Sequence, residues 1–311
     1  MLDASGPVYR IGLLWYVSSR ITYIWEGVMR TRIFLVGTIL VMVVLAAACG
    51  TRADRAKPTA ATAVPTAAAT SAALTGKISV FAASSLSDVF KAVGVAFTKA
   101  NPGVTVEFNN QSSSALATQI EQAAPADVFA SADNTNMQRL LDKGLIAGVP
   151  ANFVRNRPMI VIPADNKAQI TTPKDLSKAG VKLVLAGPDV PIGNYARQII
   201  DKLAADPAYG VAYKDATLKN LVSNEANVRA TLTKIELGEA DACFVYKTDV
   251  LVSGSKVKTV AIPDAANVIA TYQIAVVKFS QNAKAAAAFI AFIRSAEGRK
   301  LLADAGFDPV L

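Results

Sequence analysis

The 311-residue chain contains no histidine and only two cysteines, Cys49 and Cys243. Without histidine the chain cannot build a Ser–His–Asp triad, and two cysteines cannot form a zinc cluster or a disulfide framework. Walker-type and paired-glycine nucleotide-binding motifs are also absent from the sequence. These absences favour a protein that holds its ligand over one that transforms it. A hydrolase built on Ser, Lys and Asp stays open, although no motif supports it.

Charged side chains are sparse, at 18% of the chain, and the formal net charge is +8. Part of this excess precedes residue 76, because residues 76–311 hold 25 Lys and Arg against 21 Asp and Glu, a net charge of +4. No basic run interleaved with aromatic side chains is present, so we expect no nucleic-acid partner. Cys243 lies in the apolar run 242–245, which predicts a buried core residue and not a reactive thiol.

The longest uncharged apolar run covers residues 33–48 and directly follows a basic stretch at residues 30–32. A basic start, a short apolar core and small residues are typical of a secretory signal, and the run is short for a membrane span. The small residues before Cys49 resemble the lipobox of bacterial lipoproteins, although Ala46 stands where leucine is commoner. The resemblance implies that Cys49 is acylated and anchors an extracytoplasmic protein at the cell surface or in the periplasm. A plain signal and an uncleaved anchor are the alternatives.

The N-terminal residues are expected to stay outside the folded domain, with residues 1–48 as the signal region. Residues 1–28 do not fit a signal, whereas Met29 would make a normal start, so we expect the upstream stretch to be a misassigned start. Residues 49–75 are rich in Ala, Thr and Pro and hold almost no large apolar side chain. Such a segment cannot bury enough surface to fold, which predicts a disordered linker after the lipidated cysteine.

From Lys77 onward, the periods of strands and helices alternate along the chain. Such alternation predicts a parallel sheet covered by helices on both faces, and two successive series predict two lobes. The fold class is therefore expected to be α/β, with two lobes that are each a mostly parallel sheet flanked by helices. The expected strands are residues 78–82, 104–108, 127–130, 158–163, 182–186, 242–246 and 271–277. The expected helices are residues 87–100, 114–123, 134–143, 193–204, 226–237, 282–294 and 297–305.

Two serine-containing stretches stand where an apolar strand gives way to a helix, at residues 81–88 and 111–116. The first N–H groups of a helix lack intrahelical acceptors and carry the positive end of its dipole, so such a start suits an anion. The candidate donors are Ser85 and Ser113. The alternatives are an ordinary N-cap at Ser85 and a polar surface turn around Ser113. The pair favours an anion site because both strand ends belong to one sheet edge.

Three further candidates lie in the second series of strands and helices. Ile192 opens a helix and offers a free N–H, and Gly193 would let a ligand approach the backbone closely. Val228 offers an N–H at the start of another helix, and Tyr246 ends a strand with a phenol. The alternatives are a simple Pro/Gly turn, a plain capped helix and a half-buried tyrosine. Three scattered carboxylates are expected to be solvated or capping residues: Asp127, Asp133 and Asp241.

Short motifs follow one another along this part of the chain: VFAASSL (80–86), SSSALA (112–117), QIE (119–121), APADVFASAD (124–133), VPIGNYA (190–196), NVR (227–229), GEADA (238–242) and VY (245–246). In this order and spacing they resemble the molybdate-binding proteins of ABC importers. The resemblance covers the chain from about Lys77 to its C-terminus. It implies a two-lobed periplasmic-binding fold of class II that closes on tetrahedral molybdate or tungstate. Lobe 1 would comprise residues 76–157 and 268–311, and lobe 2 residues 158–267.

By motif position, the resemblance implies a ligand set of uncharged donors and no cofactor. Molybdenum or tungsten would be held only as the oxyanion, by Ser85, Ser113, Ile192, Val228 and Tyr246. Where the family commonly has alanine, this chain has Ile192, whose bulkier side chain is expected to alter the pocket rim, and Ser84, which leaves open a contact shifted by one residue. Hydrogen bonds to an ion contribute about 1.5–3 kcal/mol each. About seven such donors could offset the several kcal/mol that desolvation of a dianion costs.

The implied protein is a monomeric binding protein that delivers its anion to an ABC permease in the membrane and is not an enzyme. Hinges are expected near residues 156–158 and 268–272. The alternatives are a receptor for another tetrahedral oxyanion such as sulfate and a secreted α/β hydrolase.

Overall fold

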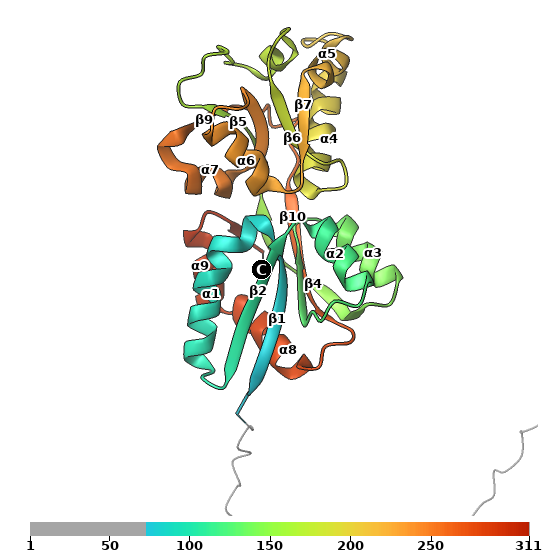
Figure 1. The fold of residues 1–311 in the computed structure, drawn as a ribbon, viewed down its shortest axis with the longest axis vertical. Helices are drawn as coiled ribbons and strands as arrows, with labels where there is room; N and C mark the ends of the chain where they lie inside the picture. Colours follow the sequence, from blue (N-terminus) through green and yellow to red (C-terminus); the bar gives the residue numbers. More distant parts are fainter. Residues whose placement is uncertain (1–72, 311) are drawn as a thin grey trace, which may run out of the picture. The chain divides into compact units, whose positions relative to one another are not determined.

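The computed structural model describes residues 73–310, which form two lobes (Figure 1). Lobe 1, residues 73–156 and 270–310, is built on a six-stranded sheet, and lobe 2, residues 158–260, on a five-stranded sheet. The predicted signal region, Cys49 and the linker up to residue 72 lie outside the described residues. Among the helices of residues 73–310, none combines the length and apolarity that crossing a membrane requires.

Lobe 1 contains the strands β1 Gly76–Ala83, β2 Val104–Gln111, β3 Val128–Ser131, β4 Ile146–Asn156, β10 Ala270–Val277 and β11 Asp308–Pro309. They are ordered β11-β4-β10-β3-β1-β2 across the sheet. β1 pairs in parallel with β2 and β3, whereas β10 runs antiparallel to β3 and β4. The parallel strands therefore all end at the same edge of the sheet, which is the edge that faces lobe 2 (Figure 1).

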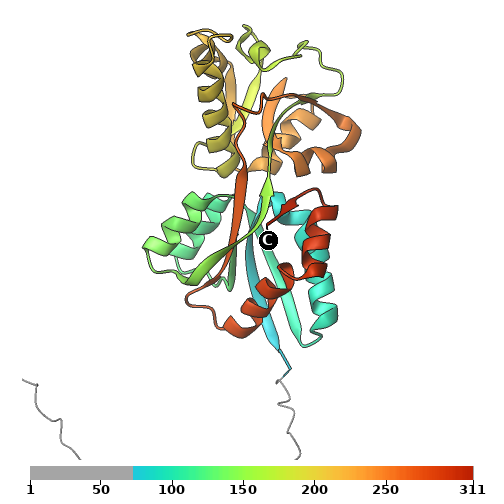
Figure 2. The same ribbon diagram turned by 180° about the vertical axis from the view of Figure 1, so that it is seen from behind.

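Helices cover both faces of the lobe 1 sheet (Figures 1 and 2). On one face lie α1 Ser87–Ala100, α8 Ala283–Ile293 and α9 Ala296–Asp304, where the ring of Phe289 packs 5.2 Å from that of Phe97 and 6.1 Å from that of Phe90. On the other face lie α2 Ser113–Glu121 and α3 Asn134–Asp142, which bury Leu116 and Met137 against the sheet. Alternate side chains of β1 thus enter separate cores, as expected for a sheet covered on both faces.

Lobe 2 contains β5 Pro158–Pro163, β6 Leu183–Ala186, β7 Leu221–Glu225, β8 Ala242–Tyr246 and β9 Val257–Val260, ordered β7-β6-β8-β5-β9. Its helices are α4 Pro191–Ala205, α5 Tyr213–Lys219, α6 Val228–Glu236 and α7 Lys247–Ser253. Short 3₁₀ turns occur at Ser84–Leu86 (η1, in lobe 1), Pro173–Ser177 (η2) and Gly254–Lys256 (η3). Cys243 in β8 is fully buried, and burial raises the pKa of its thiol, so its assignment to the core is confirmed.

The α/β class is confirmed, but both sheets are mixed and not mostly parallel. β5 runs antiparallel to β8 and β9, and β10 antiparallel to β3 and β4. The chain leaves lobe 1 at the end of β4, enters lobe 2 as β5, and returns over residues 261–269 into β10 (Figure 2). A strand that arrives from the other lobe begins at the edge where the parallel strands end, so it must run against them.

Candidate functional site

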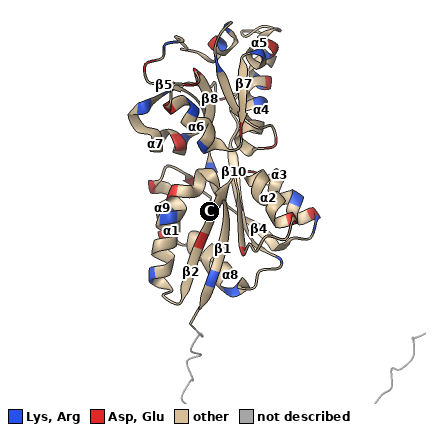
Figure 3. Ribbon diagram, in the orientation of Figure 1, with Lys and Arg blue, Asp and Glu red and all other residues tan. Residues whose placement is uncertain are grey.

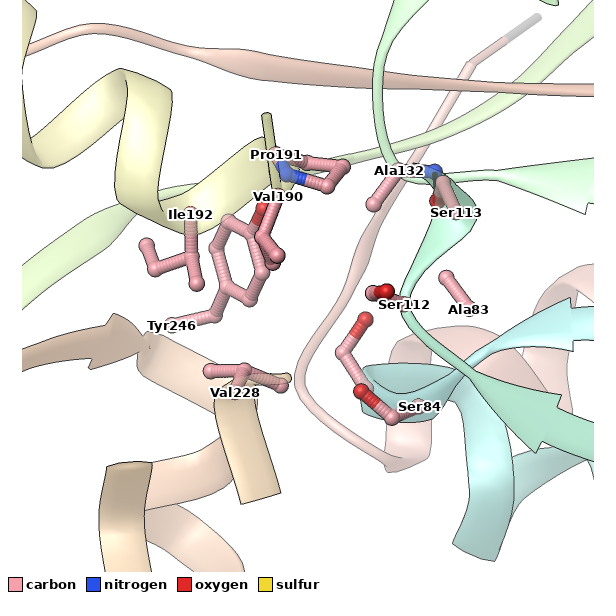
Figure 4. Close-up of a pocket in the computed structure, with 11 residues that line it drawn as sticks. Ala83, Ser84, Ser112, Ser113, Ala132, Val190, Pro191, Ile192, Val228 and Tyr246 are labelled. Atoms are coloured by element: carbon pink, nitrogen blue, oxygen red, sulfur yellow. Dashed lines mark hydrogen bonds between the residues drawn. The ribbon is translucent and has the colours of Figure 1, made fainter. Parts of the chain in front are cut away.

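A small pocket lies between the lobes, at the carboxyl ends of their parallel strands (Figure 4). The space between its lining atoms, part of which is open to solvent, is about 200 Å³. The lining residues are Ala83, Ser84, Ser85, Ser112, Ser113 and Ala132 of lobe 1 with Val190, Pro191, Ile192, Val228 and Tyr246 of lobe 2.

All five residues proposed from the sequence line this pocket: Ser85, Ser113, Ile192, Val228 and Tyr246. They come from five separate segments, two in lobe 1 and three in lobe 2. No Lys, Arg, Asp or Glu is among the lining residues, so the donors that the lining offers are hydroxyl and backbone N–H groups. The structure thus brings the five residues, which are far apart in the sequence, to one pocket.

Ser113 begins α2 and is fully buried. Its Oγ accepts a hydrogen bond from the backbone N–H of Ala132 at 2.9 Å. Because an amide N–H can only donate, the hydrogen of the Ser113 hydroxyl is left for another acceptor. The neighbouring Ser112 is the N-cap of α2, and its Oγ accepts from the N–H of Ala115 at 3.3 Å. Both serines are buried, so the alternative of a polar surface turn is wrong.

Ser85 lies in η1, between β1 and α1, and is only 3% exposed. Its Oγ is 2.8 Å from the hydroxyl of Tyr272 on β10, and either atom can donate. Neither η1 nor α1 has a side-chain cap, so the alternative of an ordinary N-cap at Ser85 is wrong. Ser84 lines the same pocket, and its carbonyl accepts from the hydroxyl of Ser87 at 2.6 Å.

Two helix starts face the serines from lobe 2. In α6, the side chain of the N-cap Asn227 accepts from the N–H groups of Arg229 and Ala230, both at 3.0 Å. The helix is therefore capped, as the alternative of a plain capped helix predicted. The N–H of Val228 in the first turn still has no intrahelical acceptor. In α4, Pro191 has no N–H, so Ile192 supplies the first such donor of that helix.

Two expectations about the start of α4 are wrong. The side chain of Ile192 is 1% exposed and packs into the lobe 2 core, so it does not enlarge the pocket rim; Figure 4 shows it pointing away from Ser112 and Ser113. Gly193 does not line the pocket. A Cβ there would lie 2.1 Å from the carbonyl oxygen of Gly187, so glycine lets α4 pack against the turn after β6 and not against a ligand.

Tyr246 ends β8 and is 1% exposed, so the alternative of a half-buried tyrosine is wrong. Its ring lies between Val190 and Val228 on the lobe 2 side of the pocket (Figure 4). Burial raises the pKa of Tyr246 well above its usual value, so the phenol keeps its proton. Its hydroxyl is buried and makes no hydrogen bond. An unpaired buried hydroxyl costs about 1–3 kcal/mol, so this group is a donor that lacks its acceptor.

Comparisons with known proteins identify the family of this chain. The sequence model of the bacterial extracellular solute-binding proteins matches residues 78–308. The chain belongs to this family. It is 40% identical to "Molybdate-binding protein ModA" of Mycobacterium tuberculosis, over 84% of this chain and 91% of that protein. It is 30% identical to "Putative ABC transporter substrate-binding lipoprotein YvgL" of Bacillus subtilis, over 74% of this chain and 85% of that protein.

Among solved structures, this solute-binding protein is similar to the substrate binding domain of a putative molybdenum ABC transporter from Clostridium difficile. The TM-score is 0.56 at 29% identity, covering 76% of this chain and 99% of that domain. The fold and the family are therefore shown by sequence and by structure together.

One cation of the solute-binding protein lies close behind the pocket. Arg229 follows Val228 in the sequence, and one of its Nη atoms lies 2.9 Å from Oδ2 of Asp88 in lobe 1. Its Nε lies 2.9 Å from Oδ1 of Asp249, but the N–H is not aligned for a hydrogen bond. Asp249 is fully buried and its other oxygen accepts the N–H of Tyr246 at 2.9 Å. Arg229 thus contacts two carboxyl groups and is not among the lining residues.

The three scattered aspartates have structural roles. Asp133 caps α3 by accepting the N–H of Asn136 at 3.0 Å, Asp127 accepts the N–H of Ser79 at 2.8 Å, and Asp241 that of Lys182 at 2.8 Å. The prediction of capping residues is confirmed for Asp133, and the other two hold backbone of neighbouring strands. Over residues 73–310, no three His, Cys, Asp or Glu side chains gather closely enough to hold a metal ion.

Sequence reasoning missed Tyr272 and Asp249 as parts of this site. Tyr272 lies 187 positions from the serine that it contacts, and no local motif marks it. Asp249 has a local signal, because it stands three residues after Tyr246 at the start of a helix, where an acidic side chain commonly accepts backbone N–H groups.

Proposed function

We propose that this protein captures molybdate or tungstate in the pocket between its lobes and delivers it to an ABC importer. The observation that carries the proposal is the hydroxyl of Tyr246, which is buried without a partner among serine hydroxyls and free N–H groups. A tetrahedral oxyanion consists of acceptor oxygens and would satisfy these donors together. The names of the relatives support molybdate as the ligand.

The energetics favour a dianion held by neutral donors. Desolvating a charged group costs several kcal/mol, and each hydrogen bond to it contributes about 1.5–3 kcal/mol. Ser85, Ser113, Ile192, Val228 and Tyr246 supply enough donors to offset the cost. A smaller oxyanion such as sulfate cannot span all of them, and each bond it fails to make leaves a buried group unpaired, which opposes its binding.

Binding is proposed to close the two lobes. We take residues 76–157 with 268–311 and residues 158–267 as the bodies that move, with hinges near residues 156–158 and 268–272. The anion touches donors from both lobes only when they are together, so it shifts the population toward the closed form. That form is the one that would dock on the membrane permease.

The cellular setting is part of the same proposal. We expect translation to begin at Met29 and a lipid on Cys49 to hold a monomer at the outer face of the membrane, with residues 49–75 as the linker. No enzymatic step, cofactor or nucleic acid is required. Mass spectrometry of the precursor and of the mature protein tests the start and the lipid, and a peptide from residues 1–28 would contradict the start at Met29.

Thermal unfolding in a panel of sodium salts tests the ligand. Molybdate and tungstate are expected to raise the melting temperature, because a ligand that binds only the folded state stabilises it. Sulfate and phosphate are expected to raise it much less. A sulfate shift equal to that of molybdate would refute the specificity, and no shift with any oxyanion would refute the function. Calorimetry with both metal oxyanions then ranks them.

Replacement of Ser113 tests the ligand set. Ser113→Ala removes one donor to the charged ligand, so we expect the dissociation constant for molybdate to rise about tenfold or more. Ser253→Ala is the matched control, because Ser253 is also buried but donates to Glu236 at 2.7 Å and does not line the pocket. Unchanged affinity in Ser113→Ala would show that this serine is not a ligand.

A further inference from the structure

The two serines proposed as ligands each have a buried polar group directly behind them. Behind Ser113 it is the backbone N–H of Ala132, at 2.9 Å from Oγ. Behind Ser85 it is the hydroxyl of Tyr272, at 2.8 Å from Oγ. For Ser113 the direction is fixed, since an N–H can only donate, and the serine hydrogen is left for the pocket. For Ser85 the direction depends on which of the two hydroxyls donates, that of Tyr272 or that of the serine.

The surroundings of Tyr272 favour donation from the phenol to the serine. Tyr272 is fully buried, and burial raises the pKa of its hydroxyl, so the proton stays on it. A phenol, with an ordinary pKa near 10, is a stronger hydrogen-bond donor than an aliphatic hydroxyl. Among the described residues, the partner of this hydroxyl is Ser85 Oγ, at 2.8 Å.

The ring of Tyr272 is also held in place. It packs edge-on against Phe153, Tyr246 and Phe307, with centroid distances of 6.4, 5.8 and 5.7 Å. The residue lies near the start of β10, opposite Val154 of β4, where the chain has just returned from lobe 2. A fixed ring keeps the hydroxyl at one position, so the hydrogen bond can set the rotamer of Ser85 before a ligand arrives.

We propose that Tyr272 is a positioning residue for the oxyanion: its hydroxyl donates to Ser85 Oγ, so that the Ser85 hydrogen points into the pocket. This inference rests on the proposed function and adds a residue that does not itself line the pocket. If Ser85 donated to Tyr272, its hydrogen would point away from the ligand and one donor would be lost. The hydrogen bond from Tyr272 also makes the Ser85 hydroxyl a stronger donor, because each hydrogen bond in a chain polarises the next.

A double-mutant cycle tests whether Tyr272 acts through Ser85. Calorimetry gives the dissociation constant for molybdate in the wild-type protein, in Tyr272→Phe, in Ser85→Ala and in the double variant. We expect Tyr272→Phe to weaken binding about tenfold, which corresponds to about 1.4 kcal/mol. In the Ser85→Ala background the same replacement should cost less than about twofold, because the group it orients is gone.

Tyr213→Phe is the matched control. Tyr213 is a buried tyrosine of lobe 2 whose hydroxyl donates to the carbonyl of Pro173 at 2.9 Å, and it does not line the pocket. Its replacement should lower the melting temperature and leave the affinity unchanged. A merely structural Tyr272 would behave like this control or would weaken binding equally in both backgrounds. Either result overturns the inference.

The failure of the inference differs from the failure of the proposed function. If the wild-type protein binds molybdate, additive effects in the cycle overturn the role of Tyr272 alone. If it binds none of molybdate, tungstate and sulfate, the proposed function fails and the inference fails with it.

Discussion

The hydroxyl of Tyr246 is buried without a hydrogen-bond partner, whereas the other buried tyrosine hydroxyls at Tyr213 and Tyr272 have one each. A folded protein keeps such a group at a cost of about 1–3 kcal/mol, and an acceptor that arrives with the ligand removes that cost. The hydroxyl of Tyr246 therefore lowers the stability of the free protein and raises its affinity for the proposed ligand.

Tyr246→Phe separates the two effects. Without the hydroxyl, the ligand-free protein should gain about 1 kcal/mol of unfolding free energy, because the unpaired group is gone, and molybdate should bind about tenfold more weakly or worse. Denaturant unfolding and calorimetry measure the two quantities. Tyr213→Phe removes a paired hydroxyl and should lower the stability without changing the affinity. A loss of stability in Tyr246→Phe would show that its hydroxyl has a partner in the free protein.

The carboxyl group of Asp249 makes the stability of the folded protein depend on pH. Burial raises the pKa of this carboxyl from 3.8 to about 6, and the charge of Arg229 and the N–H of Tyr246 only partly oppose the rise. A raised pKa means that the folded protein binds the proton more tightly than the unfolded chain does. The contribution to stability is therefore fully present below about pH 3.8 and is lost as the pH rises through about 6.

Asp249→Asn cannot titrate and serves as the reference. The unfolding free energy of the wild type minus that of Asp249→Asn should fall as the pH rises from about 4 to about 7. Chemical denaturation of both proteins in the same buffers measures it. Asp88 and Arg229 are present beside position 249 in both proteins, so the comparison changes only the group at position 249. A difference that rises over this range would mean that the ion pair with Arg229 outweighs burial.

At the scale of elements, those with a regular local pattern were predictable. The helix expected at residues 87–100 is α1 Ser87–Ala100, and the strand expected at 158–163 is β5 Pro158–Pro163. The strand β4 was missed because Gly148 and Pro150 interrupt its alternation and its pairing with β10 shifts register. Three other short strands were missed because none of them carries an apolar run: β7 (LVSNE), β9 (VKTV) and β11 (DP).

The start of α4 depends on a glycine for its position. A Cβ at Gly193 would lie 2.1 Å from the carbonyl oxygen of Gly187 and 2.3 Å from that of Ala186. Gly193→Ala must therefore displace the helix start and with it the N–H of Ile192. We expect a lower melting temperature and weaker molybdate binding.

Gly298→Ala is the control for this prediction. Its Cβ would lie 2.2 Å from the carbonyl oxygen of Phe292, a similar clash at the start of α9 in lobe 1, and it does not line the pocket. It should lower the melting temperature and leave the affinity of the folded protein unchanged. Equal affinity in the two variants would mean that the position of the α4 start does not matter for the ligand.

For the whole molecule, the contacts that sequence reasoning could not reach join segments far apart in the chain. Ser85 meets Tyr272, and Asp88 of lobe 1 meets Arg229 of lobe 2. Local periodicity holds no information on such pairs, and charge does not single them out, because Lys and Arg lie interspersed with Asp and Glu over both lobes (Figure 3). The motifs indicated the five residues that line the pocket only because their order resembled that of a family.

The pair of Asp88 and Arg229 joins the lobes, so it exists only when they are together. Its oxygen and nitrogen are 2.9 Å apart, and the two side chains are 51% and 25% exposed. An ion pair of this exposure contributes about 0.2–1 kcal/mol. Asp88→Asn should therefore shift the ligand-free equilibrium toward the open form by up to about fivefold.

Spin labels on Val95→Cys in lobe 1 and Val222→Cys in lobe 2 report this equilibrium as a distance distribution. Both positions are exposed and the native Cys243 is buried, and Cys49→Ser in every variant removes the second native thiol, so neither cysteine competes for the label. Asp189→Asn is the charge-matched control, because it removes a carboxylate next to the lining residue Val190 and has no ion pair with lobe 1. If Asp88→Asn and Asp189→Asn gave the same distribution as the wild type, the ion pair would have no part in closure. If both opened the lobes equally, the effect would belong to local charge and not to the contact between Asp88 and Arg229.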